Sequence, residues 1–89
     1  MANAIFYFIL SVMPLTYQPP VSTLVKELRR RLQLSQEGLA ERMGTSFSTV
    51  NRWENGRSHP SPMALKLIEF LLKDMGESGT DLLELYFTK

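Results

Sequence analysis

Residues 28–62 read LRRRLQLSQEGLAERMGTSFSTVNRWENGRSHPSP, and the only tryptophan of the chain, Trp53, lies in the most polar part of this stretch. On a helix, Trp53 and Val50 are three residues apart and therefore share one face. Polar residues cover the rest of the surface: Ser48, Thr49, Asn51, Arg52 and Asn55. The pattern predicts a helix that is anchored by a narrow apolar face and offers a polar face to a partner.

Two short helices are predicted around a turn in this stretch. Ser35 caps a helix over 36–43, and Gly44 ends it, as glycine does where the chain must adopt a positive φ. Ser46 then caps the helix over 47–54. Two short helices separated by a few residues that include a glycine are typical of a helix-turn-helix unit.

One further helix is predicted before this pair. Over about 22–32, apolar residues recur at 3.6-residue spacing and form one stripe, while the charged residues lie off this stripe. Ser22 or Thr23 can cap the start of this helix. Arg30 and Arg31 lie off the apolar stripe, and we expect both to be solvated.

Two more helices are predicted after the pair. The Ser61-Pro62 dipeptide is a strong helix start, and the helix runs to about Met75 before glycines 76 and 79 close it. Thr80 can cap a last helix over 81–87. Its apolar residues exceed what one buried stripe needs, so we expect it to serve both the core and a dimer surface.

The composition limits the classes of function. The chain has 89 residues and no cysteine, which allows one helical domain and excludes disulfides and thiolate metal sites. With one histidine and scattered carboxylates, neither a metal site nor a nucleophile–base pair can be assembled. We therefore expect no enzymatic activity, no metal and no cofactor. The absence of cysteine suits a cytoplasmic protein.

The charge is distributed unevenly. Residues 21–75 carry nine Lys/Arg against six Asp/Glu, a net +3, and three consecutive arginines at 29–31 concentrate it. Residues 76–89 carry one Lys against three acids, a net −2. The basic middle is suited to an anionic polymer, and a solvated helix face explains it equally well.

The first 20 residues form a separate segment. Residues 4–13 (AIFYFILSVM) are too short for a membrane helix and lack the preceding basic residues of a secretory signal. Three alternatives are open: a strand, a loosely packed leader upstream of a true start at Met13, or an anchor for a membrane or partner. Among these alternatives, binding to a membrane is the one that we do not expect. We divide the chain into an apolar extension with a Pro-rich linker, 1–20, and a domain, 21–89.

Residues 28–62 resemble the Cro/CI-type helix-turn-helix family, which includes phage repressors, xenobiotic-response-type regulators and many antitoxins. The matching elements are Leu34-Ser35-Gln36, Leu39-Ala40, Gly44, Val50, Trp53-Glu54-Asn55-Gly56 and Pro60. With the flanking helices the resemblance covers about 21–87. It implies an all-α fold: a compact five-helix, lambda-repressor-like DNA-binding domain with the helix-turn-helix at its second and third helices.

The resemblance also implies roles for individual residues. Base-contacting positions are Phe47, Ser48, Asn51 and Arg52. Phosphate-contacting positions are Gln36, Thr49, Asn55 and Arg57. Structural positions are Ala40, Gly44, Val50 and Trp53, together with an ion pair between Arg29 and Glu54. Gln36 is also expected to touch the helix over 47–54, which in this family is the recognition helix that enters the major groove.

The sequence departs from the family pattern at two positions. Gly38 stands where the family usually has glutamate, so the capping box is missing and the helix is weakened by about 1 kcal/mol. Phe47 stands where a polar residue is usual, and it can only contact a thymine methyl or pack against the scaffold. Base discrimination would then depend mainly on Asn51 and Arg52.

The leading hypothesis is a transcriptional repressor that binds double-stranded DNA sequence-specifically, as a homodimer on a palindromic operator with half-sites about one helical turn apart. One alternative is an antitoxin of a toxin–antitoxin system, with the N-terminal segment binding the toxin. Another is a protein-interaction module on the same scaffold that has lost DNA binding, which Phe47 invites.

Overall fold

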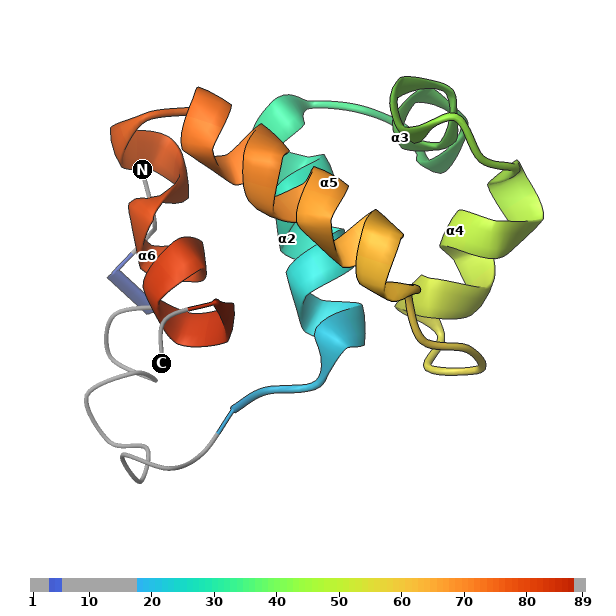
Figure 1. The fold of residues 1–89 in the computed structure, drawn as a ribbon, viewed down its shortest axis with the longest axis horizontal. Helices are drawn as coiled ribbons and strands as arrows, with labels where there is room; N and C mark the ends of the chain where they lie inside the picture. The colour runs from blue at the N-terminus through green and yellow to red at the C-terminus, as the bar shows by residue number, and fades with distance from the viewer. Residues whose placement is uncertain (1–3, 6–17, 88–89) are drawn as a thin grey trace.

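The computed structural model describes residues 4–5 and 18–87. Residues 18–87 contain five α-helices and no strand: α2 (Val21–Leu32), α3 (Gln36–Met43), α4 (Phe47–Glu54), α5 (Pro62–Asp74) and α6 (Glu77–Tyr86). Helices α2 and α5 lie at the centre, with α3 and α4 on one side and α6 on the other (Figure 1). The predicted all-α, five-helix fold is confirmed.

The strand or leader proposed for residues 4–13 falls almost wholly outside the described residues. The two that are described, Ala4 and Ile5, have helical backbone conformation and are exposed. Within the described ranges, no helix is both long and apolar enough to cross a membrane. The division of the chain at residue 20 stays a prediction.

Every one of the five helices contributes to one core. Its buried apolar residues are Leu24, Val25, Leu28, Leu39, Ala40, Val50, Trp53, Ile68, Leu71, Leu72 and Leu82. Three of them come from α2 at the 3.6-residue spacing that predicted this helix. The apolar stripes read from the sequence therefore meet at the centre of the fold.

Three helix starts follow the serine caps that were predicted. Ser35, Ser46 and Ser61 have extended backbones, and their hydroxyls accept hydrogen bonds from the backbone N–H groups three residues later. Such a cap contributes about 1 kcal/mol, because it satisfies a donor that has no partner within the helix. The predicted boundaries of α3 and α4 are confirmed.

The predicted cap of α2 is wrong. The residue before the helix is Pro20, no side chain caps the start, and the Thr23 N–H donates to the Pro20 carbonyl at 2.9 Å. Ser22 and Thr23 thus lie inside the first turn. Pro20 itself is extended, with a φ of −56° and a ψ of 148°, and the helix begins directly after it.

The predicted start of the last helix is also wrong. Helix α6 begins at Glu77, after Gly76 with a φ of 64°, and Thr80 lies within it, donating its hydroxyl to the Gly76 carbonyl. Gly79 does not close α5; it is a buried residue of α6. A Cβ at this position would lie 2.1 Å from the Leu72 carbonyl oxygen. Glycine is therefore needed for the close approach of α6 to α5.

Gly79→Ala is expected to lower the free energy of unfolding by about 1–3 kcal/mol, because the added methyl must push the two helix backbones apart. The control is Gly38→Ala in α3, where the atoms nearest to the new Cβ would belong to the Leu34 side chain, at 3.3 Å, and to the Ser35 hydroxyl. Alanine favours a helix by up to about 1 kcal/mol, so this second variant should not be destabilised. Urea titrations compare the two; equal destabilisation would contradict the close approach at Gly79.

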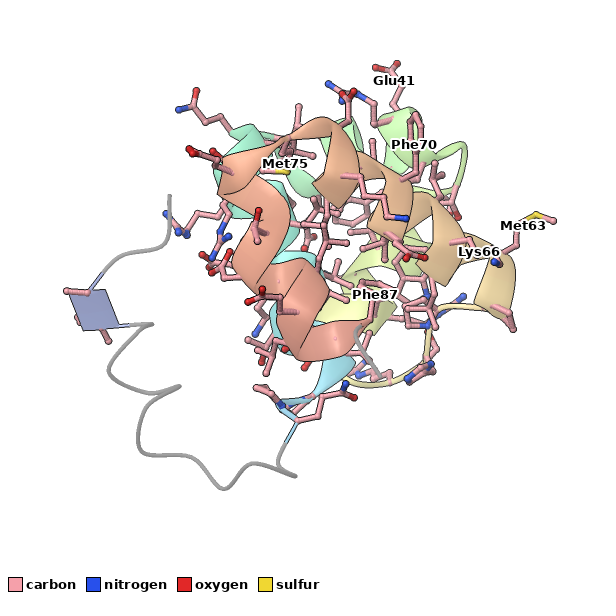
Figure 2. All side chains as sticks on the ribbon, turned by 60° about the vertical axis from the view of Figure 1, so that its left-hand side comes forward. Glu41, Met63, Lys66, Phe70, Met75 and Phe87 are labelled. Atoms are coloured by element: carbon pink, nitrogen blue, oxygen red, sulfur yellow. The ribbon has the colours of Figure 1, made fainter. Side chains whose placement is uncertain are left out.

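The large apolar side chains that are exposed on the last two helices belong to α5 and not to the described part of α6. Met63 and Phe70 are exposed and project outward from α5 (Figure 2). On α6, Leu82 is buried, while Leu83 and Tyr86 are partly buried against the core. The dimer surface expected on the last helix stays a prediction.

Candidate nucleic-acid interface

The turn between α3 and α4 is fixed by backbone hydrogen bonds. Gly44 has a φ of 70°, and its N–H donates to the Glu41 carbonyl, while the Thr45 N–H donates to the Ala40 carbonyl at 2.9 Å. Glycine adopts this left-handed conformation without the steric cost that other residues have. Helix α3 therefore ends and α4 begins within three residues, as a helix-turn-helix unit requires.

Helix α4 has the two faces that its sequence predicts. Val50 is fully buried and Trp53 is 6% exposed, both in the core. On the outer side, Ser48 and Arg52 are exposed, and Asn51 is partly buried at its edge. The helix is thus anchored by the apolar pair, and the polar side chains face away from the core.

The other predicted contact residues surround this outer face. Phe47, at the first turn of α4, is 49% exposed, so its side chain is accessible to a partner. Thr49 is partly buried, and its N–H and hydroxyl contact the Ser46 hydroxyl at 3.1 and 2.9 Å. Asn55 and Arg57 are exposed where the chain leaves α4. All of these roles in DNA contact stay predictions.

The acid of α4 is buried and paired. Glu54 is 4% exposed, and Arg29 of α2 donates to both of its oxygens, from Nε at 2.7 Å and Nη2 at 3.0 Å. Arg29 also donates from Nη1 to the Leu34 carbonyl. The pair implied by the resemblance is therefore present, and it ties α2 both to the end of α4 and to the segment before α3.

A chain of side-chain amides continues from this ion pair to the surface. Gln36 Nε2 donates to Glu54 Oε1 at 2.9 Å, and Asn51 Nδ2 donates to Gln36 Oε1 at 3.1 Å. Asn55 Nδ2 donates to Asn51 Oδ1 at 3.1 Å. We call Gln36, Asn51 and Asn55 the amide relay. The contact of Gln36 with α4 was expected; the engagement of Asn51 on both sides was not, although the i,i+4 spacing of the two asparagines is a signal for it.

With this geometry in place, comparison with known proteins assigns the family. The family model described as "Helix-turn-helix" matches residues 25–72, which is more than half of the chain and includes α3, α4 and the turn between them. The chain belongs to the Cro/CI-type helix-turn-helix family. No solved structure matches the chain significantly.

Two curated proteins are similar to part of this chain. One is the type II methyltransferase M1.ScrFI of Lactococcus lactis subsp. cremoris, 39% identical over a 51-residue alignment that covers 54% of this chain and 13% of that protein. Another is an uncharacterized HTH-type transcriptional regulator of Methanothermobacter thermautotrophicus, 49% identical over 39 residues, which are 44% of this chain and 56% of that protein. The chain thus spans less than two thirds of either relative.

The electrostatics of the ion pair suit the helix-turn-helix face. Burial alone would raise the pKa of Glu54, but the hydrogen bonds from Arg29 and Gln36 outweigh it and hold the pKa below its usual value of 4.5. The Glu54 hydrogen bond also raises the pKa of Arg29. The carboxylate therefore stays ionised at neutral pH, and its charge is balanced by the guanidinium.

The prediction that Arg31 is solvated is wrong. Its side chain is 4% exposed and donates to Asp81 at 2.7 and 2.9 Å, to the Ser78 carbonyl and to Glu27. Arg30, in contrast, is exposed as predicted and pairs with Glu27 on the surface. Arg31 thus joins α2 to α6 and cannot contribute to a basic DNA-binding surface.

The two carboxylates that pair with Arg31, those of Asp81 and Glu27, have lowered pKa values. Burial raises the pKa of Asp81, and the hydrogen bonds from Arg31 outweigh that effect, so the pKa falls below its usual value of 3.8. The hydrogen bond from Arg30 lowers the pKa of Glu27 below 4.5 against the effect of burial. Together with Glu54, three carboxylates are more acidic in the folded chain.

Acid is therefore expected to destabilise the fold in a defined range. Carboxylates with lowered folded pKa values contribute their full stabilisation above their ordinary values of 3.8 and 4.5, and lose it as the pH falls through the folded values. Urea midpoints should be nearly constant from about pH 7 to about pH 5 and then fall towards about pH 3. Asp81→Asn should reduce this dependence; a midpoint unchanged down to the lowest pH would contradict it.

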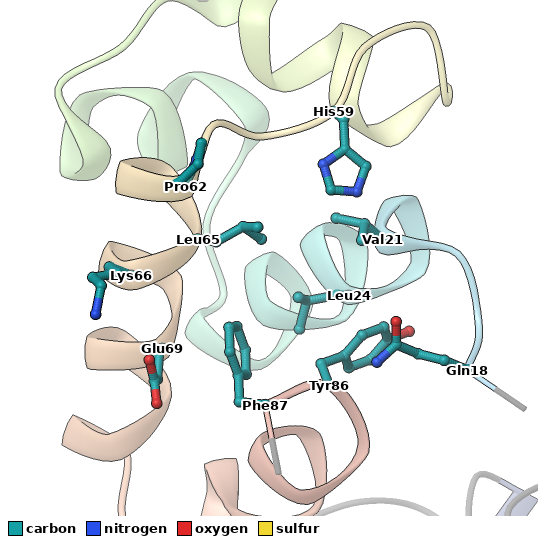
Figure 3. A pocket seen from close by; sticks show the side chains of 10 residues that line it. All are labelled: Gln18, Val21, Leu24, His59, Pro62, Leu65, Lys66, Glu69, Tyr86 and Phe87. Carbon is teal, nitrogen blue, oxygen red and sulfur yellow. The ribbon is translucent and has the colours of Figure 1, made fainter. Parts of the chain in front are cut away.

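Two cavities open to the surface differ in whether the predicted DNA-contacting residues line them. One, of about 370 Å³, lies between α2, α5 and the end of α6, and none of the predicted DNA contacts lines it (Figure 3). A groove of about 650 Å³ runs between α4 and the start of α5, and its lining includes Thr49, Arg52 and Ser61. No group of three or more His, Asp or Glu side chains suited to a metal occurs among the described residues.

Proposed function

We propose that the protein is a DNA-binding transcriptional regulator, a repressor that recognises double-stranded DNA sequence-specifically rather than an enzyme. The observation that carries the proposal is the outer face of α4, where Ser48, Asn51 and Arg52 point away from the core while the acid of this helix, Glu54, is buried against Arg29. An unpaired carboxylate there would repel the phosphate backbone. The proposal places the protein in the compartment that holds its DNA, the cytoplasm.

Base reading is assigned to the exposed end of this face. The major groove is about 12 Å wide and admits one α-helix, so α4 can place its outer side chains against base edges. Arg52 is exposed and suited to the two acceptors of guanine, and Asn51 is suited to adenine. Phe47, half exposed at the first turn, can meet a thymine methyl.

Phosphate contacts are assigned to residues at the margins of the helix pair. Gln36 starts α3, and Thr49, Asn55 and Arg57 lie along α4 and directly after it. The groove between α4 and α5 brings Thr49 near Ser61, the cap of α5, where backbone N–H groups suit an anion. Such contacts fix register and orientation but carry no base preference.

The homodimer is the finer part of the proposal. Family members of this kind place two recognition helices in successive major grooves, about one helical turn apart, so the operator should be a palindrome. The HTH-type transcriptional regulator among the relatives supports a regulatory role. The antitoxin alternative depends on the N-terminal segment, which lies mostly outside the described residues.

The test is the salt dependence of binding to duplexes selected from a random pool. Each phosphate neutralised by a cation steepens the slope of log K against log salt by about −0.9. A selected palindrome bound with a steeply negative slope is expected. A flat slope with no enriched sequence would contradict DNA binding and favour the protein-interaction alternative.

A further inference from the structure

We propose that the groove between α4 and the start of α5 binds an amphipathic anion, a carboxylate on an apolar tail of medium length, and that this ligand releases the protein from DNA. The volume of the groove, about 650 Å³, lies within the range of about 300–1,000 Å³ that is typical of small-molecule sites. The release rests on the proposed function, whereas the binding of the ligand can be measured without DNA.

Most of the large side chains that line the groove are apolar. They are Met43 at the end of α3, Trp53 of α4, and Met63 and Leu67 of α5. Met63 is 82% exposed and Leu67 is partly buried, so a ligand can reach both. Each methylene group that is transferred from water to such a surface strengthens binding by up to about 4-fold. The lining therefore favours a ligand with an apolar tail.

The groove carries a cation and no acid. Among the described residues that line it, Arg52 is the one Lys or Arg, and none is Asp or Glu. Arg52 is exposed and forms no ion pair or side-chain hydrogen bond with any other described residue. Its planar guanidinium presents parallel N–H donors that match the two oxygens of a carboxylate. Charge complementarity therefore favours a carboxylate as the head of the ligand.

Polar and apolar side chains lie at different places along the groove. Arg52 lies in the last turn of α4, and Ser58 and Ser61, whose hydroxyls can donate to an anion, follow in the segment that leads to α5. Leu67 lies six residues beyond Ser61, about 9 Å along the α5 axis. A carboxylate held near Arg52 thus allows an apolar tail to extend towards Leu67.

The ligand and DNA would compete for the same side chains. Arg52 is assigned to a base edge, and Thr49, which also lines the groove, is assigned to a phosphate. A guanidinium that holds a carboxylate cannot present the same N–H groups to guanine, and an anion in the groove repels the phosphate backbone. The affinity for the operator should therefore fall as the ligand fills the groove, and DNA should lower the affinity for the ligand by the same factor.

Trp53 allows the ligand to be detected in the full chain without DNA. It is the only tryptophan of the sequence, and it lines the groove. Octanoate should change its fluorescence with a saturable dependence on concentration. Butyrate has the same carboxylate and four fewer methylene groups, so its Kd should be about 10-fold to 200-fold higher. Octanoate should also raise the midpoint of thermal unfolding, because it binds the folded chain.

Three variants locate the ligand. Arg52→Met should raise the Kd for octanoate by about 5-fold to 10-fold, because the partner of the carboxylate is lost. Arg42→Met is the same chemical change at an exposed arginine outside the groove, and it should leave the Kd unchanged. Lys66→Met removes a cation that lines the other cavity (Figure 3) and should also leave the Kd unchanged. A higher Kd in Lys66→Met but not in Arg52→Met would place the ligand in that cavity and overturn the proposal.

The last measurement links the ligand to DNA binding. With octanoate at ten times its Kd, the Kd for the selected duplex should rise about 10-fold, whereas butyrate at the same concentration should change it by less than about 2-fold. An operator affinity that octanoate does not lower would overturn the proposal. So would equal effects of octanoate and butyrate, a fluorescence change that does not saturate, or a lower unfolding midpoint. If no duplex is enriched, the proposed function fails together with the release, while the fluorescence titration still decides whether the groove binds the ligand.

Discussion

Arg31→Met is expected to lower the free energy of unfolding by about 3–5 kcal/mol, the range typical for removing one partner of a buried ion pair. The Arg31 side chain is 4% exposed and donates to both oxygens of Asp81. Methionine preserves much of the volume but none of the donors. Asp81 would then remain partly buried without the guanidinium that balances it, Glu27 would keep only its pair with Arg30, and the attachment of α6 to α2 would weaken.

The neighbouring arginine provides the matched control. Arg30 carries the same charge one residue earlier in the same helix, but its side chain is 56% exposed. Arg30→Met should leave the urea midpoint almost unchanged, because exposed ion pairs contribute little to stability. If the two variants had the same midpoint, the assignment of Arg31 as the link between α2 and α6 would be wrong.

The exposure of Arg30 was predicted correctly from the sequence, whereas the burial of Arg31 was not. Helices α3 and α4 were predicted with their boundaries because their signals are local: a serine cap within three residues of its partner N–H, and glycine at a positive φ. The Arg29–Glu54 pair came from the family resemblance, which carries spatial information that spacing alone does not.

The predictions that were wrong share a physical cause: each depends on contact between residues that are far apart in the chain. Arg31 lies 50 residues from Asp81, and no local pattern distinguishes it from Arg30. Gly79 resembles a helix terminator in the sequence, but its role depends on the backbone of Leu72 in another helix. The amide relay was only half anticipated, because its orientation depends on a carboxylate brought to Gln36 by the fold.

The second large effect is expected at Arg52. Arg52→Ala should lower the affinity for the selected operator by about 1–3 kcal/mol, roughly 5-fold to 150-fold, because one bidentate contact with guanine is lost. The side chain is exposed on the outer face of α4, so truncation should leave the core unchanged. Affinity for an unrelated duplex should fall much less, since non-specific binding depends on phosphate contacts.

Arg57→Ala provides the comparison, because Arg57 is exposed just beyond α4 and is assigned to a phosphate. The decisive measurement is the ratio of affinities for the operator and an unrelated duplex, determined for the unchanged protein and for both variants at one salt concentration. Arg52→Ala is expected to lower this ratio, whereas Arg57→Ala should weaken binding to both duplexes and leave the ratio nearly unchanged. A ratio that Arg52→Ala leaves intact would contradict sequence reading by α4.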